Sequence, residues 1–135
     1  MKKRWLSISM FALILVSLIP ISSAEAAGNG SWDRILSGTL DYNPTYGFCD
    51  SANARSTGGD VLIRGEVPYV TYELWESDPG SGNDDYIGKR YLTPEKINGI
   101  FRGINWAVDG SNNRAELYVK VNGRAVDGKW VGIWD

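Results

Sequence analysis

The stretch YELWESDPGSGNDDYIG, residues 72–88, gathers acidic side chains around a Pro-Gly turn. Glu76 and Asp78 lie two residues apart where the chain enters the turn, and Asp84 and Asp85 follow the turn. Calcium takes about six to eight oxygen ligands, which a Gly-rich loop with several acids can supply. We therefore predict a calcium site formed by Glu76, Asp78, Asp84 and Asp85. The open alternative is a solvated hairpin loop, because Asp-Pro-Gly-Ser-Gly-Asn is ordinary turn composition.

The chain contains no histidine, which excludes most hydrolytic mechanisms. Ser-His-Asp and Cys-His arrangements and the imidazole ligands of catalytic zinc all require that side chain. The remaining chemistry is a pair of carboxylates acting on a glycosidic bond. Surface glutamates are far commoner than catalytic ones, so we expect no enzymatic activity, with a small carboxylate glycosidase as an alternative. The candidate acids for that alternative are Glu66, Glu73, Glu76 and Glu95.

The longer string VTYELWESDPGSGNDDYIGKRYL, residues 70–92, resembles part of a known calcium-binding family. It is similar to the third calcium loop of the calcium- and phospholipid-binding domains of synaptotagmins and protein kinase C. Glu76 and Asp78 match the acid pair at the end of a strand, Asp85 matches the later acid, and residues 86–88 match the next strand start. The resemblance implies an eight-stranded antiparallel β-sandwich and calcium ions shared with an earlier loop. The family's basic lipid-binding strand has no counterpart here, so membrane binding is not expected.

The elements that position these residues are predicted to be strands. Runs rich in Val, Ile, Thr, Tyr and Trp alternate with Gly, Asn, Asp and Pro. Alternation is clearest at residues 70–74 and 115–121, and Asn122-Gly123 predicts a tight hairpin. Residues 93–99 predict a helical turn that begins at Thr93. We expect a single-domain, all-β, antiparallel β-sandwich of about seven or eight strands. The expected strands are residues 35–42, 60–67, 69–76, 86–92, 101–109, 114–121 and 124–134, and residues 43–59 are expected to form a long loop.

The beginning of the chain predicts the compartment. MKKR precedes a long apolar run that ends at Ala24-Glu25-Ala26, a pattern typical of a cleaved signal peptide. We expect residues 1–26 to be removed and residues 27–135 to form a secreted, extracellular domain; a retained membrane anchor is the alternative. Without the first 26 residues, the chain has 11 basic and 15 acidic side chains, a net charge of −4. This acidity argues against a nucleic acid partner. Cys49 is the only cysteine, so no intramolecular disulfide forms, and we expect a monomer.

Aromatic residues are abundant, with five tryptophans and seven tyrosines after residue 26. Most of them could fill the core, where each ring would bury a large area. Alternatively, Tyr69, Trp75 and Tyr118 could form an exposed strip that binds a ligand. We expect a small secreted binding protein, dependent on calcium, whose ligand is an extracellular protein, a carbohydrate or another cell-surface ligand. A secreted antimicrobial or toxin-like protein and an inhibitor of an extracellular enzyme are alternatives.

Overall fold

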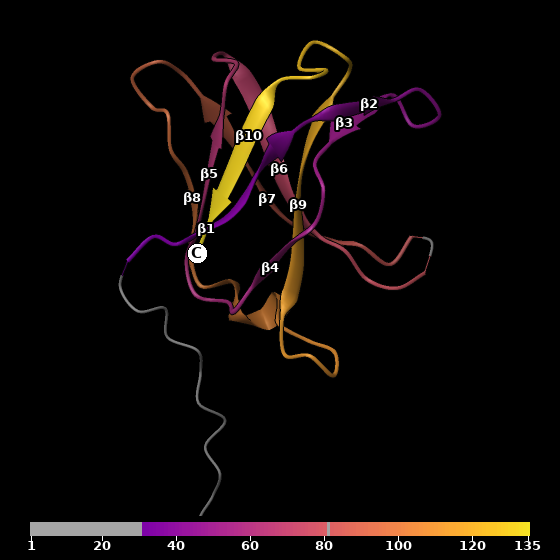
Figure 1. Cartoon of the computed structure of the whole chain (residues 1–135), viewed down its shortest axis with the longest axis vertical. Coiled ribbons are helices and arrows are strands. Elements are labelled where there is room, and N and C mark those ends of the chain that lie inside the picture. The colour runs from indigo at the N-terminus through magenta and orange to yellow at the C-terminus, as the bar shows by residue number, and fades with distance from the viewer. Residues whose placement is uncertain (1–30, 81) are drawn as a thin grey trace, which may run out of the picture.

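The computed structural model describes residues 31–80 and 82–135, and their strands form two antiparallel sheets (Figure 1). The first sheet has four strands, in the spatial order β1-β10-β5-β8. Their bounds are Arg34–Thr39 for β1, Trp130–Trp134 for β10, Val61–Gly65 for β5 and Gly99–Phe101 for β8.

The second sheet has six strands, of which five follow the order β2-β3-β9-β6-β7. The sixth, β4, pairs with β9 beyond the part of β9 that pairs with β3. The bounds are Asp41–Asn43 for β2, Phe48–Asp50 for β3, Ala115–Asn122 for β9, Val70–Glu76 for β6, Asp85–Leu92 for β7 and Ala54–Ser56 for β4.

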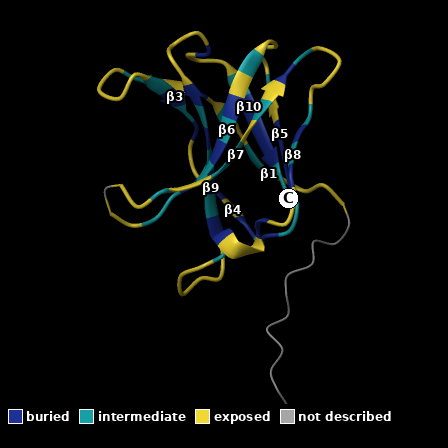
Figure 2. Cartoon of the chain, turned by 180° about the vertical axis from the view of Figure 1, so that it is seen from behind, coloured by how far each residue is buried: buried dark blue, intermediate teal, exposed yellow. Residues whose placement is uncertain are grey.

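Both sheets contribute alternate side chains to one hydrophobic core, which Figure 2 shows in dark blue. Tyr72 of β6 is the largest fully buried side chain. Its hydroxyl donates a 2.9 Å hydrogen bond to the carbonyl of Val67, and Gly65 leaves room for its ring, because a Cβ at Gly65 would lie 2.1 Å from that ring. The all-β expectation is confirmed. Other core residues are Val61, Ile63, Leu74, Leu117, Val119, Val131 and Ile133.

The expected long loop at residues 43–59 is wrong, because it contains β3 and β4. Each of these strands is three residues long and is defined by its pairing, β3 with β2 and β9, and β4 with β9. So short a segment carries no alternation of its own that a sequence pattern could reveal.

Four expected strands also differ from the prediction. Residues 35–42 are divided between β1 and β2, which lie in different sheets, and residues 60–67 contain only the five-residue strand β5. Of residues 101–109, only Phe101 belongs to a strand, because Gly103 adopts a left-handed backbone with φ of 63° and begins a 3₁₀ helix, Ile104–Ala107. In residues 124–134, turns precede β10, which begins only at Trp130. Gly128, with φ of 71°, lies in that turn segment.

The predicted helical turn at residues 93–99 is a bend without a helix. The Thr93 hydroxyl nevertheless accepts a hydrogen bond of 3.2 Å from the Lys96 backbone N–H, as it would at a helix start. Within residues 31–80 and 82–135, no helix has the length and apolar character needed to cross a membrane. The signal peptide predicted for residues 1–26 lies outside the described residues.

Candidate functional site

Glu76 is the one acidic side chain on the buried face of β6 in the described chain. The strand alternates, so Tyr72, Leu74 and Glu76 all point to the core side. Glu76 is the last residue of the strand and is only 1 % exposed. One carboxylate oxygen, Oε1, accepts a long 3.4 Å hydrogen bond from the backbone N–H of Glu116 in the neighbouring strand β9.

The pKa of Glu76 is raised from 4.5 to about 7, first by burial and then by the nearby Asp78 carboxylate. The hydrogen bond from Glu116 acts in the opposite direction, since it favours the charged form. Near neutral pH the side chain is therefore divided between its protonated and ionised forms.

Four further carboxylates surround Glu76 and come from three parts of the chain. Asp85 lies directly opposite Glu76 in the pairing of β6 with β7. Oxygens of Glu76, Asp78 and Asp85 lie within 4.8 Å of one another, and so do oxygens of Glu76, Asp109 and Glu116. These five residues, Glu76, Asp78, Asp85, Asp109 and Glu116, are called the carboxylate centre below.

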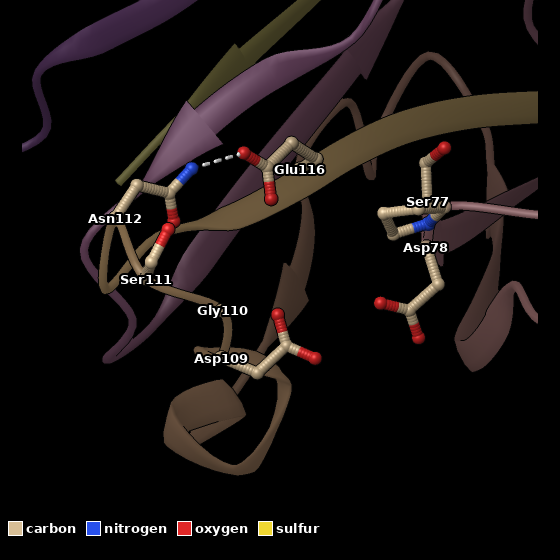
Figure 3. Close-up of a pocket in the computed structure, with 8 residues that line it drawn as sticks. Ser77, Asp78, Asp109, Gly110, Ser111, Asn112 and Glu116 are labelled. Carbon is tan, nitrogen blue, oxygen red and sulfur yellow. Dashed lines mark hydrogen bonds between the residues drawn. The ribbon is translucent and has the colours of Figure 1, made fainter.

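A pocket of about 500 Å³ opens beside the centre, between the residues that follow β6 and the hairpin that precedes β9. Figure 3 shows the carboxylates of Asp78 and Asp109 facing each other across it, with Glu116 on the same side as the hairpin. The two sides of the hairpin pair through an isolated antiparallel β-bridge between the backbones of Asp109 and Arg114. Asn112 also donates a 2.7 Å hydrogen bond to Glu116, which fixes that carboxylate at the rim.

The charge of the centre is poorly compensated by the described residues around it. Arg55 lies 3.9 Å from Glu116, but its side chain is 76 % exposed and therefore well screened. Partial desolvation and the neighbouring Asp109 and Asp85 carboxylates raise the pKa of Asp78. The centre thus offers a cation oxygen ligands alone, at separations that a calcium ion can span with bonds of about 2.3–2.6 Å. Zinc or copper would prefer nitrogen or sulfur ligands.

The structure brings together three of the four predicted ligands, Glu76, Asp78 and Asp85. Asp84 instead turns toward β9, where its Oδ2 accepts a 2.8 Å hydrogen bond from the Tyr118 hydroxyl. Its Oδ1 accepts a 3.2 Å hydrogen bond from the Asp78 backbone N–H. Asp109 and Glu116 were not predicted, because only the pairing of β6 with β9 brings them to Glu76.

A second candidate site lies on the outer face of the six-stranded sheet. Trp75 and Tyr118 are directly opposite each other in the pairing of β6 with β9. They help to line a groove of about 570 Å³, called the aromatic groove below. Tyr69 is exposed but precedes β6 at its other end, six residues from Trp75, a separation of about 20 Å along a strand. The groove is lined by Asn43, Tyr46, Phe48, Asp50, Ser51, Asn53, Trp75, Ser77, Gly80, Gly82, Asp84, Tyr118 and Lys120.

The aromatic residues do not mainly fill the core. Among the described residues, only Tyr72 and Phe101 have fully buried aromatic rings. Trp106, in the 3₁₀ helix, is 58 % exposed. The core is built instead of aliphatic side chains, and this leaves most of the rings available to the surface.

The comparisons with known proteins place the chain in a family. The family described as the YndA coiled coil domain matches residues 34–133. The uncharacterized protein YndA of Bacillus subtilis (strain 168) is 39% identical over 118 residues, which cover 85% of this chain and 83% of that protein. The chain belongs to the YndA family. No solved structure matches it.

The YndA match runs from the first residue of β1 to the last residue but one of β10. It therefore spans both sheets, the carboxylate centre and the aromatic groove. The family description names a coiled coil, whereas the matched residues of this YndA member that the structure describes form strands, turns and one 3₁₀ helix. The YndA domain in this chain is thus a β domain.

Proposed function

We propose that this YndA-family protein is a secreted β-sandwich domain that binds an extracellular ligand and holds calcium at the carboxylate centre, without catalysing a reaction. The observation that carries the proposal is the convergence of carboxylates from three chain segments on the buried Glu76 side chain. A solvated hairpin loop would place its acids in water, not against a carboxylate that is 1 % exposed.

The energetic argument concerns the cost of an ionised Glu76. An isolated buried carboxylate is strongly unfavourable unless it is protonated, paired or bound to a cation. No described basic side chain forms an ion pair with Glu76 within 4.0 Å. A divalent cation between Glu76, Asp109 and Glu116 would neutralise that charge and remove the mutual repulsion of the acids.

The geometry also speaks against the glycosidase alternative. A carboxyl group with a raised pKa, close to a second carboxylate, is the usual pair for glycoside hydrolysis. Of the four candidate acids, Glu76 has a raised pKa, but neither it nor Glu66, Glu73 or Glu95 lines the pocket, so a sugar bound there would not contact them. A single ion can reach a ligand atom that a sugar ring cannot, and this difference favours binding over catalysis.

Thermal unfolding with calcium, with magnesium and with a chelator tests the proposal. An ion that binds only the native state at 100 times its Kd stabilises it by about 2.7 kcal/mol. For a domain of this size, that corresponds to a rise in Tm of roughly 10 °C or more. Glu76→Gln should abolish the calcium response, whereas Glu95→Gln, an equal charge change at an exposed residue, should retain it. An unchanged Tm of the original protein at millimolar calcium would refute the calcium site.

A further inference from the structure

We infer that the aromatic groove binds a neutral saccharide chain. This inference names a ligand class for the proposed binding function and rests on that function, but it does not depend on the calcium ion. It is carried by the position of the groove, by its aromatic and polar lining, and by its charge.

The groove lies between two loops that project from the same side of the molecule. Residues 44–47 connect β2 to β3 at one end, and the described residues 77–80 and 82–84 lie between β6 and β7 at the other (Figure 1). The floor is the outer face of β3, β9 and β6, which are neighbours in the sheet. Both loops contribute lining residues, Tyr46 from the first and Gly80, Gly82 and Asp84 from the second, so the groove extends across the sheet from one loop to the other, a span that suits a chain-like ligand.

Aromatic rings along the groove provide surfaces on which sugars can stack. Tyr46 is 70 % exposed and lies nearly parallel to Phe48, with 5.7 Å between ring centroids and an interplanar angle of 13°. Farther along, Trp75 packs against Tyr86 at 5.1 Å. The C–H bonds of a pyranose ring make one of its faces apolar, and that face can cover an exposed aromatic ring and remove both from water.

Polar groups in the groove are held in place by contacts within the protein. The Lys120 ammonium lies 4.6 Å from the centroid of Phe48 and 4.7 Å from that of Trp75, and Glu73 is 3.8 Å away. Tyr118 is fixed by its hydrogen bond to Asp84. Such fixed groups can bond to the hydroxyls of a sugar with little additional loss of conformational freedom. Asn53, which is exposed on the same groove, adds both a donor and an acceptor.

The charge of the groove selects against anionic polymers. Asp50 and Asp84 line it, whereas Lys120, the one basic residue in its described lining, is already paired with Glu73. Nucleic acids, polyphosphates and sulfated glycans would therefore meet repulsion. An extended peptide is also disfavoured, because peptides commonly add to a free sheet edge, and β9 and β6 have strand partners on both sides.

Affinity electrophoresis and titration calorimetry with soluble glucan, xylan and chitin oligosaccharides test the inference. The matched variants are Tyr46→Ala in the groove and Tyr91→Ala at another exposed tyrosine, on β7. We expect at least one neutral saccharide to bind, with affinity reduced about tenfold or more by Tyr46→Ala, equivalent to about 1.4 kcal/mol, and unchanged by Tyr91→Ala. Asn53→Ala should weaken binding in the same assay.

Three results would overturn the inference. They are failure of every neutral saccharide to bind, tighter binding of dextran sulfate or an unstructured peptide, and equal losses in the Tyr46→Ala and Tyr91→Ala proteins. Calcium-dependent unfolding of the same variants separates the two proposals. Tyr46→Ala should keep the full calcium response, so loss of saccharide binding and loss of the ion can be told apart.

Discussion

The hydroxyl of Tyr118 donates a 2.8 Å hydrogen bond to Asp84 and so connects the aromatic groove to the loop that contains Asp78 of the carboxylate centre. The same Asp84 side chain accepts a hydrogen bond from the Asp78 backbone N–H. Ser77, at the start of that loop, lines both the groove and the acidic pocket. The two sites therefore share one segment of the chain, which begins at Ser77.

Tyr118→Phe should loosen this segment without removing any carboxylate. Loss of one hydrogen bond to a charged acceptor costs roughly 1–2 kcal/mol at a partly buried position. We expect that decrease in the free energy of unfolding, measured by urea denaturation, together with a smaller loss of calcium affinity. Tyr91→Phe removes a hydroxyl from an exposed side chain and serves as the control. Equal stability of the Tyr118→Phe and original proteins would contradict a structural role for the bond.

Asp109→Asn and Asp84→Asn distinguish the observed centre from the ligand set that the sequence predicted. Asp109 contributes an oxygen to the centre, whereas both Asp84 oxygens are engaged elsewhere. Calorimetry should show calcium affinity reduced about tenfold or more by Asp109→Asn, because one charged ligand is lost. Asp84→Asn should have a clearly smaller effect. If Asp84→Asn proved the more damaging change, the ion would lie in the loop and not in the centre.

The stability of the calcium-free protein should fall as pH rises, because of Glu76. Its pKa is about 7 in the folded state against an ordinary value of 4.5, so between these values the folded state binds more protons than the unfolded state. The stabilisation is complete below pH 4.5 and is lost as pH rises through about 7. Its size is on the order of 3 kcal/mol.

Urea denaturation at several pH values, in the presence of a chelator, measures this effect. The Glu76→Gln protein should lack that part of the pH dependence, because glutamine does not titrate. Subtraction of its profile from that of the original protein removes the contributions of all other groups. Parallel profiles of the two proteins would show that Glu76 titrates normally in the folded state.

Gly65→Ala adds a single methyl group but should destabilise the domain strongly. The added Cβ would lie 2.1 Å from the Tyr72 ring, which is fully buried between the sheets and has little room to move. Overpacking of this kind costs about 1–3 kcal/mol. Gly38→Ala is the matched control, since its Cβ would have no neighbour closer than 4.0 Å. The Tm measured by thermal unfolding should be well below that of Gly38→Ala for the Gly65→Ala protein. The reverse order of the two Tm values would contradict the packing described for Tyr72.

Secretion can be tested on the chain as it is expressed. A signal peptide that ends at Ala26 predicts that the protein recovered from the culture medium begins at Ala27. N-terminal sequencing or intact mass measurement of that protein checks the prediction. Replacement of Ala24 and Ala26 by bulky residues should prevent cleavage, because the peptidase requires small side chains there. Recovery of the uncleaved chain from the cell pellet alone would contradict secretion.

The sequence by itself determined the long strands and three of the acids that converge. In β6 and β9 buried and more exposed side chains alternate with a period of two. This alternation is a property of each strand alone and does not depend on which strand pairs with it. The same alternation extends from Tyr72 and Leu74 to Glu76, so burial of this acid could have been predicted. Proximity in the chain suggested Asp78, Asp84 and Asp85 alike, and only the register of β6 with β7 placed Asp85 opposite Glu76.

Only the tertiary structure decided the rest of the carboxylate centre and the groove. Glu116 is 40 residues from Glu76 and reaches it through the pairing of β6 with β9, which no local pattern specifies. The strands β3 and β4 are defined by their pairing with other strands, β3 with β2 and β9, and β4 with β9, and β3 brings Phe48 to Lys120. Alternation fixes which face a side chain takes, but the register between strands distant in sequence fixes which side chains meet.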